Sequence, residues 1–258
     1  MGTSGNRGGS TPNTPIVPPH ADSSPDTPPP QRPENGLRKF RSSLTSFAKY
    51  GGEERATKAK ASFVKNATGG ASGATRRQGA VSAAAGSAIA ALANAAGGAL
   101  AGQAQAAQGP DLSACVGRPI TEVAGVIAQA VAPDTSEGDH VSAVISEAVD
   151  RAYEQGDVFD PNAIDEAFLD RVLFDCIVES ILYDLTAREG GASMENAGSP
   201  AGQIARENEM RQYIQADVDD RLSNMPQAGT ITSKSADEIK DFILQCNEAV
   251  FRAWENGE

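Results

Sequence analysis

The sequence has few of the residues that enzymes use most often for acid–base and nucleophilic chemistry. Its two histidines are His20 and His140, and neither lies where a Ser-His-Asp or Cys-His arrangement can be assembled. The sequence also lacks the H-E-x-x-H motif of zinc peptidases, the G-x-x-x-x-G-K-[ST] phosphate loop and a strand-bound G-x-G-x-x-G. We therefore predict that the protein is not an enzyme and that it has no catalytic residues and no cofactor.

Cysteine is also scarce, and its spacing excludes the usual disulfide and zinc frameworks. Cys115, Cys176 and Cys246 are far apart, each lies within an apolar helical pattern, and no C-x-x-C pair occurs. This usage predicts buried, reduced thiols in a cytoplasmic protein.

The N-terminus has no basic segment followed by an apolar run, so we expect no secretory signal. The acids at positions 217–220 are predicted to be solvated surface charge, and no metal site is expected.

No stretch of the chain is both long and strongly apolar. Residues 78–110 carry no charge, but their only strongly apolar side chains are Val81, Ile89, Leu92 and Leu100. Each of these contributes only about 0.3 to 0.6 kcal/mol to membrane insertion. We therefore predict that the chain does not enter a membrane, and we assign residues 78–110 to an Ala/Gly-rich helix or linker.

Charge, by contrast, is abundant and unevenly distributed. Residues 1–110 contain 12 basic and 5 acidic residues, a net charge of +7, whereas residues 111–258 contain 10 basic and 29 acidic residues, a net charge of −19. The two values together give the formal charge of −12 for the whole chain. One half can attract phosphates or an acidic partner that the other half repels, and the two halves can attract each other.

The first 36 residues form a proline-rich arm. They hold nine of the fifteen prolines and, beyond Ile16 and Val17, hardly any apolar side chain. Such a segment buries too little surface to offset the entropy lost on ordering, so residues 1–36 are predicted to be disordered and partly polyproline-like. The small residue after Met1 favours removal of the initiator methionine, which would leave a free α-amine on Gly2.

Residues 37–77 form a basic segment with an amphipathic start. Leu37, Phe40, Leu44, Phe47 and Tyr50 recur at helical spacing, which predicts a helix ended by the glycines at 51 and 52. Basic side chains interleaved with aromatic rings favour a protein partner, with nucleic acid as the first alternative and an acidic membrane surface as the last. The residues predicted to bind this partner are Arg38, Lys39, Phe40, Arg41, Phe47 and Tyr50.

Residues 111–258 have the pattern of an acidic bundle of about five helices. The predicted helices are 119–132, 139–155, 162–187, 201–224 and 236–254. Ser235 and Glu238 have the spacing of a capping box at the start of the last helix, and the Gly-rich segment 189–200 is predicted to be an exposed loop. The fold class predicted for the whole chain is therefore all-α.

Several motifs, taken in order, resemble those of a known family. The chain begins M-G-T-S, continues after the arm with L-R-K-F-R-S-S-L-T-S-F-A-K-Y-G-G (37–52), and later has V-G-R-P-I-T-E-V (116–123) and A-P-D (132–134). This order resembles the QatB family of the bacterial Qat anti-phage defence system over essentially the whole chain. The sequence departs from the family pattern at K-Y-G-G (49–52), which lacks a serine between the tyrosine and the glycines.

The resemblance implies a scaffold or adaptor subunit that works beside three other proteins: a QatA-like ATPase, a QatC (QueC-like) enzyme and a QatD (TatD-like) nuclease. QueC-like enzymes use ATP to activate a carboxylate for attack by an amine. We therefore expect the α-amine of Gly2 to be modified with a deazaguanine-type group, with Thr3 and Ser4 completing the recognition sequence. The alternative is an adaptor that recruits nucleic acid or the nuclease through residues 37–65 and has an inert arm.

Overall fold

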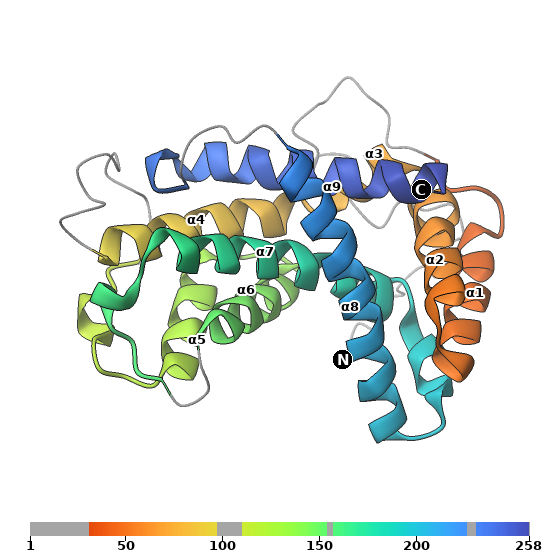
Figure 1. The fold of residues 1–258 in the computed structure, drawn as a ribbon, viewed down its shortest axis with the longest axis horizontal. Helices are drawn as coiled ribbons and strands as arrows, with labels where there is room; N and C mark the ends of the chain where they lie inside the picture. Colours follow the sequence, from red (N-terminus) through yellow and green to blue (C-terminus); the bar gives the residue numbers. More distant parts are fainter. Residues whose placement is uncertain (1–30, 97–109, 154–156, 226–230, 258) are drawn as a thin grey trace, which may run out of the picture.

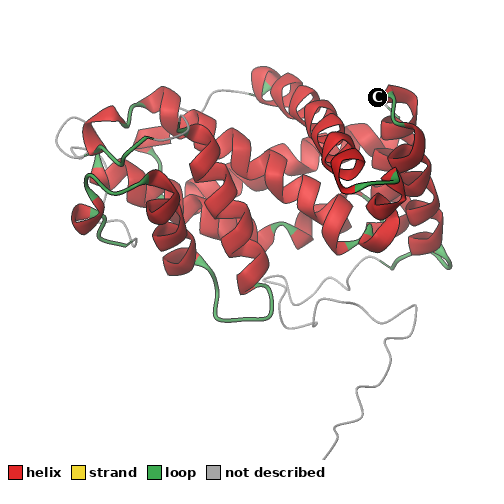
Figure 2. Ribbon diagram, turned by 90° about the horizontal axis from the view of Figure 1, so that it is seen from below, coloured by secondary structure: helices red, strands yellow, loops and turns green. Residues whose placement is uncertain are grey.

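The structure is a computed structural model that describes residues 31–96, 110–153, 157–225 and 231–257. These residues are mostly helical, and no strand occurs among them apart from one isolated bridge between Pro119 and Val158 (Figure 2). The prediction of an all-α fold is confirmed. The longest elements are α7 (Glu166–Tyr183), α8 (Pro200–Asn224) and α9 (Ala236–Asn256), which all come from the C-terminal half. The helices of the N-terminal half pack against them (Figure 1).

The first helix, α1 (Gly36–Tyr50), follows the predicted amphipathic pattern. Phe40, Leu44 and Phe47 lie on its buried face, and Gly51 ends it with a positive φ of 62°, which glycine adopts without strain. Helix α2 (Glu53–Ser62) begins with two acids that favour the positive end of its dipole, and it continues into a π-helical segment, Phe63–Thr68. The short helix α3 (Ala71–Arg77) completes the basic segment.

The uncharged region is helical where the structure describes it. Helix α4 (Gly79–Ala95) is almost entirely buried and packs on α9 (Ala236–Asn256) and α7 (Glu166–Tyr183) (Figure 1). Small side chains permit this because a helix of alanine and glycine lets a neighbouring backbone approach closely. Among the described residues, no helix has the length and apolar character needed to cross a bilayer.

The remaining helices are α5 (Ile120–Val131), α6 (Gly138–Ala152) and α8 (Pro200–Asn224). Together with α7 and α9 they occupy the positions predicted for the five helices of residues 111–258, with boundaries shifted by a few residues. The capping box at the start of α9 is confirmed, since Ser235 accepts a bond from the Glu238 backbone and Glu238 accepts one from Ser235.

One hydrophobic core joins the two halves of the sequence. A row of aromatic contacts runs from Phe40 to Phe63 (ring centroids 5.5 Å apart), on to Phe251 (6.1 Å) and then to Trp254 (5.7 Å). These rings come from α1, the π-helical segment and α9. Residues on both sides of position 111 therefore share the same core.

Two further expectations concern buried groups. The three cysteines are free and buried, as predicted. The prediction of an exposed loop at 189–200 is wrong for its first half: residues 191–197 form a 3₁₀ helix, Gly191–Ala197, and Glu189, Ser193 and Met194 are buried. The physical reason is that this segment packs against α1.

Candidate functional site: the arm root and an adjoining groove

The arm root, residues 31–36, is tied to the helical body by a buried carboxylate. The Nη2 atom of Arg32 donates to both oxygens of Glu189 at 3.2 Å, and its Nε donates to the carbonyl oxygen of Ala67 at 2.6 Å. Arg77 forms a second ion pair with the same carboxylate. Glu189 is only 1% exposed, so this cluster attaches Arg32 to the interior of the helical body.

The two arginines offset the free-energy cost of burying the charge of Glu189. A buried carboxylate is stable only when it is paired and hydrogen-bonded, and here two guanidinium groups donate to it. Burial lowers the pKa of Arg32, and the negative charge of Glu189 opposes that shift. Because two arginines pair with Glu189, removal of Arg32 leaves the buried carboxylate paired with Arg77.

A second buried acid, Asp184, lies one helical turn before Glu189 in the chain. It is fully buried and accepts a hydrogen bond from Nε2 of Gln78 at 2.8 Å. Arg188 pairs with Asp184 and, at 2.7 Å, with Glu137. Burial raises the pKa of Asp184 to about 6 despite the nearby arginine. The charged side chains of the π-helical segment Asp184–Arg188 thus tie it to Gln78 and Glu137.

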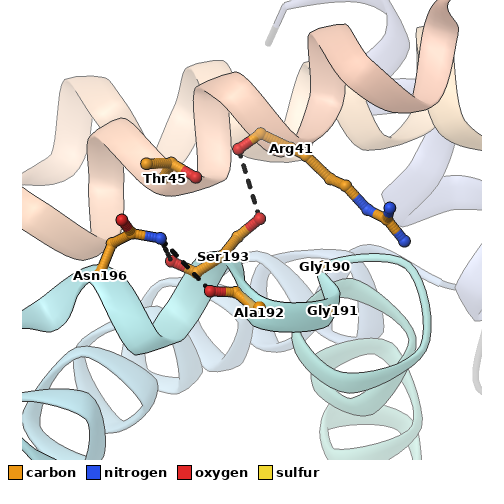
Figure 3. A pocket seen from close by; sticks show the side chains of 7 residues that line it. All are labelled: Arg41, Thr45, Gly190, Gly191, Ala192, Ser193 and Asn196. Atoms are coloured by element: carbon orange, nitrogen blue, oxygen red, sulfur yellow. Dashed lines mark hydrogen bonds between the residues drawn. The ribbon is translucent and has the colours of Figure 1, made fainter.

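An open groove of about 320 Å³ lies beside the arm root, between α1 and the 3₁₀ helix Gly191–Ala197 (Figure 3). Its walls present both polar and apolar atoms. The lining residues are Arg41, Thr45, Gly190, Gly191, Ala192, Ser193 and Asn196.

Internal hydrogen bonds hold the walls of this groove in place. Nε of Arg41 donates to the carbonyl oxygen of Glu189 at 2.9 Å, and the Ser193 hydroxyl donates to the carbonyl oxygen of Arg41 at 3.4 Å. The amide nitrogen of Asn196 donates to the carbonyl oxygens of Ala192 and Ser193 (Figure 3). The groove therefore adjoins the Glu189 cluster through Arg41.

The structure separates the residues predicted to bind a partner into two groups. Arg38, Lys39, Arg41 and Tyr50 are exposed, Tyr50 to 67%. Phe40 and Phe47 are fully buried, because the apolar face of an amphipathic helix packs into the core. These two rings stabilise the fold and offer no surface to a partner.

The remaining predicted site residues, Gly2, Thr3 and Ser4, lie outside the described residues. Within the described ranges, no group of three His, Cys, Asp or Glu side chains is arranged to hold a metal ion. Of the acids at 217–220, Asp217 has a structural partner on each side: it pairs with Lys60 of α2 and accepts a bond from the indole nitrogen of Trp254 at 2.6 Å.

Glu189 was missed by sequence reasoning. It stands in a Gly-rich stretch that is typical of surface loops, and its partners Arg32 and Arg77 are 157 and 112 residues away. A single acid before two glycines gives no sign of burial. Only the way the basic segment folds back on the acidic one brings the three side chains together.

These features define an all-helical protein. Within the residues that the structure describes, buried ion pairs join segments that are distant in the sequence, and other basic side chains of α1 are exposed to solvent. Comparison with known families gives a direct assignment: the model described as "Qat anti-phage system associated protein QatB" matches residues 69–254, well over half of the chain. The chain therefore belongs to the QatB family and has a role in the Qat anti-phage defence system. No curated protein and no solved structure matched it.

Proposed function

We propose that this chain is a non-enzymatic scaffold of a cytoplasmic defence complex. It would hold together a QatA-like ATPase, a QatC (QueC-like) enzyme and a QatD (TatD-like) nuclease. Membership in the QatB family supports the assignment to the complex. The observation that carries the scaffold role is the arm root: a buried ion-pair cluster attaches Arg32 to the helical body.

The N-terminal segment would present a substrate for the QueC-like partner. After loss of Met1, the α-amine of Gly2 has an ordinary pKa of about 8, well below that of lysine, so a useful fraction is unprotonated near neutral pH. This amine would attack a deazaguanine-type carboxylate that ATP has activated as an acyl-adenylate. A C–N amide bond forms, the acyl–oxygen bond to AMP breaks, and the amine proton passes to solvent. Thr3 and Ser4 would complete the recognition sequence.

Intact-mass analysis tests the acceptor role. Co-expression with the QueC-like enzyme should add a defined mass to the N-terminal peptide, and omission of the enzyme should remove it. Gly2→Pro, or deletion of residues 2–10, should abolish the added mass and phage defence while the purified complex still assembles. Gly9→Ala, farther along the arm, is the matched control and should behave like the wild type. An unmodified N-terminal peptide in the complete complex would sink the acceptor role.

A second function is favoured by the exposed face of α1. Arg38, Lys39 and Arg41 are exposed there and could recruit nucleic acid or the nuclease while the arm remains inert. Binding of either would then weaken steeply with salt and map to residues 37–65. Deletion of the arm would leave defence intact, which is the opposite of the result expected for an acceptor.

A further inference from the structure

The groove beside the arm root has an arginine whose charge the fold does not neutralise. Three guanidinium groups, those of Arg32, Arg77 and Arg41, contact Glu189. The first two pair with its oxygens, whereas Arg41 gives its Nε to a neutral backbone carbonyl. Within the described part of the chain, Arg41 forms no ion pair. One positive charge therefore remains at the edge of the groove.

The shape of the groove leaves room for a ligand beside this charge. Gly191 has a left-handed φ of 53°, and a Cβ atom placed there would lie 3.5 Å from Nη2 of Arg41. A side chain at this position would occupy the space next to the guanidinium, and glycine keeps it open. Thr45, Ser193 and Asn196 line the remainder. A volume of about 320 Å³ lies at the small end of ligand pockets, which suits one or two side chains.

Given the adaptor role proposed above, we propose that this groove binds an acidic segment of a partner protein, with the Arg41 guanidinium contacting a carboxylate. Arginine is suited to this because its planar fork of donors matches the two oxygens of a carboxylate. The hydroxyls of Thr45 and Ser193 and the amide of Asn196 can bond the peptide groups that flank the acid.

Nucleic acid fits the groove less well. Its lining contains no aromatic ring on which a base could stack, and Phe40 and Phe47 of the same helix are buried. The net charge of −19 on residues 111–258 also repels a polyphosphate. A peptide with a few carboxylates meets much less of this repulsion and still gains the contact with Arg41.

Titration of the ¹⁵N-labelled full chain with an acidic peptide tests the proposal. The probe is acetylated Glu-Asp-Gly-Glu-Asp, and its Gln/Asn analogue is the neutral reference. The acidic peptide should shift the amide signals of Gly191, Ala192 and Ser193, whereas the neutral peptide should not. Arg41→Ala should raise the Kd about tenfold, as expected when a charged hydrogen-bonding partner is lost. Arg252→Ala removes an equal charge from the exposed surface of α9, outside the groove lining, and should change the Kd less than about twofold.

A blocking variant keeps the test decisive if Arg41→Ala fails to fold. Ala192 is exposed and lines the groove, so Ala192→Trp should fill the groove and weaken binding to a similar extent. The proposal is overturned if the shifts lie elsewhere, if Arg252→Ala weakens binding as much as Arg41→Ala, or if a single-stranded oligonucleotide occupies the groove more tightly than the peptide. Groove binding does not depend on the added mass on Gly2, so failure of either proposal can be recognised separately.

Discussion

The imidazole of His140 lies in an environment that disfavours its charged form. It stacks on Tyr183 with ring centroids 3.9 Å apart and planes inclined by 13°, and its Nε2 atom is buried with no hydrogen-bond partner among the described residues. Burial and the positive charge of Arg188 lower the pKa of His140 to about 4, and Glu137 opposes them only in part. The ring is therefore neutral in the folded protein well below pH 6.

This pKa predicts an acid-labile contribution to stability. Between pH 6.5 and 4 the unfolded chain binds a proton at His140 that the folded chain does not, so the free energy of unfolding falls as the pH is lowered. His140→Phe keeps the stacked ring and removes the titration. Relative to wild type, the variant should gain about 2 kcal/mol between pH 6.5 and pH 4, after reduction for the partial exposure of the ring.

Urea unfolding of both proteins across this pH range measures the difference. Asp184, whose pKa is raised to about 6, has the opposite effect, since it favours the folded state as the pH falls below 6. It is present in both proteins and cancels in the comparison. A difference that stays constant from pH 6.5 to pH 4 would show that His140 titrates normally. Above pH 7 the difference should be flat in any case.

At the scale of elements, the close approach of α4 and α9 depends on a single glycine. A Cβ atom at Gly86 would lie 2.3 Å from the carbonyl oxygen of Ala236 and 3.3 Å from the backbone nitrogen of Lys240. Both are backbone atoms at the start of α9, and they cannot rotate away as the end of a side chain can. Any larger residue must push the two helices apart.

Gly86→Ala should therefore lower the free energy of unfolding by about 2 kcal/mol, the usual cost of overpacking, although alanine favours helix formation. Gly79→Ala is the matched control on the same helix, because a Cβ atom there meets nothing within 4 Å. It should be neutral or stabilise by no more than about 1 kcal/mol. Urea denaturation of the wild type and the two variants measures these differences. Equal effects of both substitutions would contradict the close packing of α4 on α9.

The helices differ in how well the local sequence predicts them. Helices α1, α5 and α9 follow from apolar spacing and from local signals such as the Ser235–Glu238 capping box, all of which lie within a few residues. Helix α4 has almost no such signal, since alanine and glycine give no apolar stripe, and its helical state was left open beside a linker. It is fixed by contacts with α7 and α9, which the local sequence does not contain.

At the scale of the whole molecule, the opposite charges of the two halves form contacts with each other within the same chain. Polar contacts join the basic segment to the acidic one at several places: Lys60 with Asp217, Arg77 with Glu189, and the backbone nitrogen of Gly52 with Glu209 at 2.7 Å. The charge division was visible in the sequence, and so was the possibility that the halves attract each other. The individual pairs were not, because they span more than 100 residues.

The ion pair between Arg32 of the arm root and Glu189 gives a further testable prediction. Residues 31 and 33–35 are exposed, whereas Gly36 is buried where α1 begins, so Arg32 is the side chain that holds the part of the root before α1 against the body. In Arg32→Ala the root should open more often, and a Glu-specific protease should cleave after Glu34 about tenfold faster, in keeping with the loss of a charged hydrogen bond.

The fold itself should survive this change. Arg77 still neutralises Glu189, and the buried face of α1 is untouched, so the melting temperature should stay within about 2 °C of the wild type. Arg38→Ala, which removes the same charge from the first turns of α1, should leave the cleavage rate unchanged. Equal cleavage of wild type and Arg32→Ala would mean that the root is held by something other than the Glu189 cluster. Faster cleavage together with a large drop in melting temperature would mean that Arg32 supports the body as a whole and does not act as a local attachment of the arm.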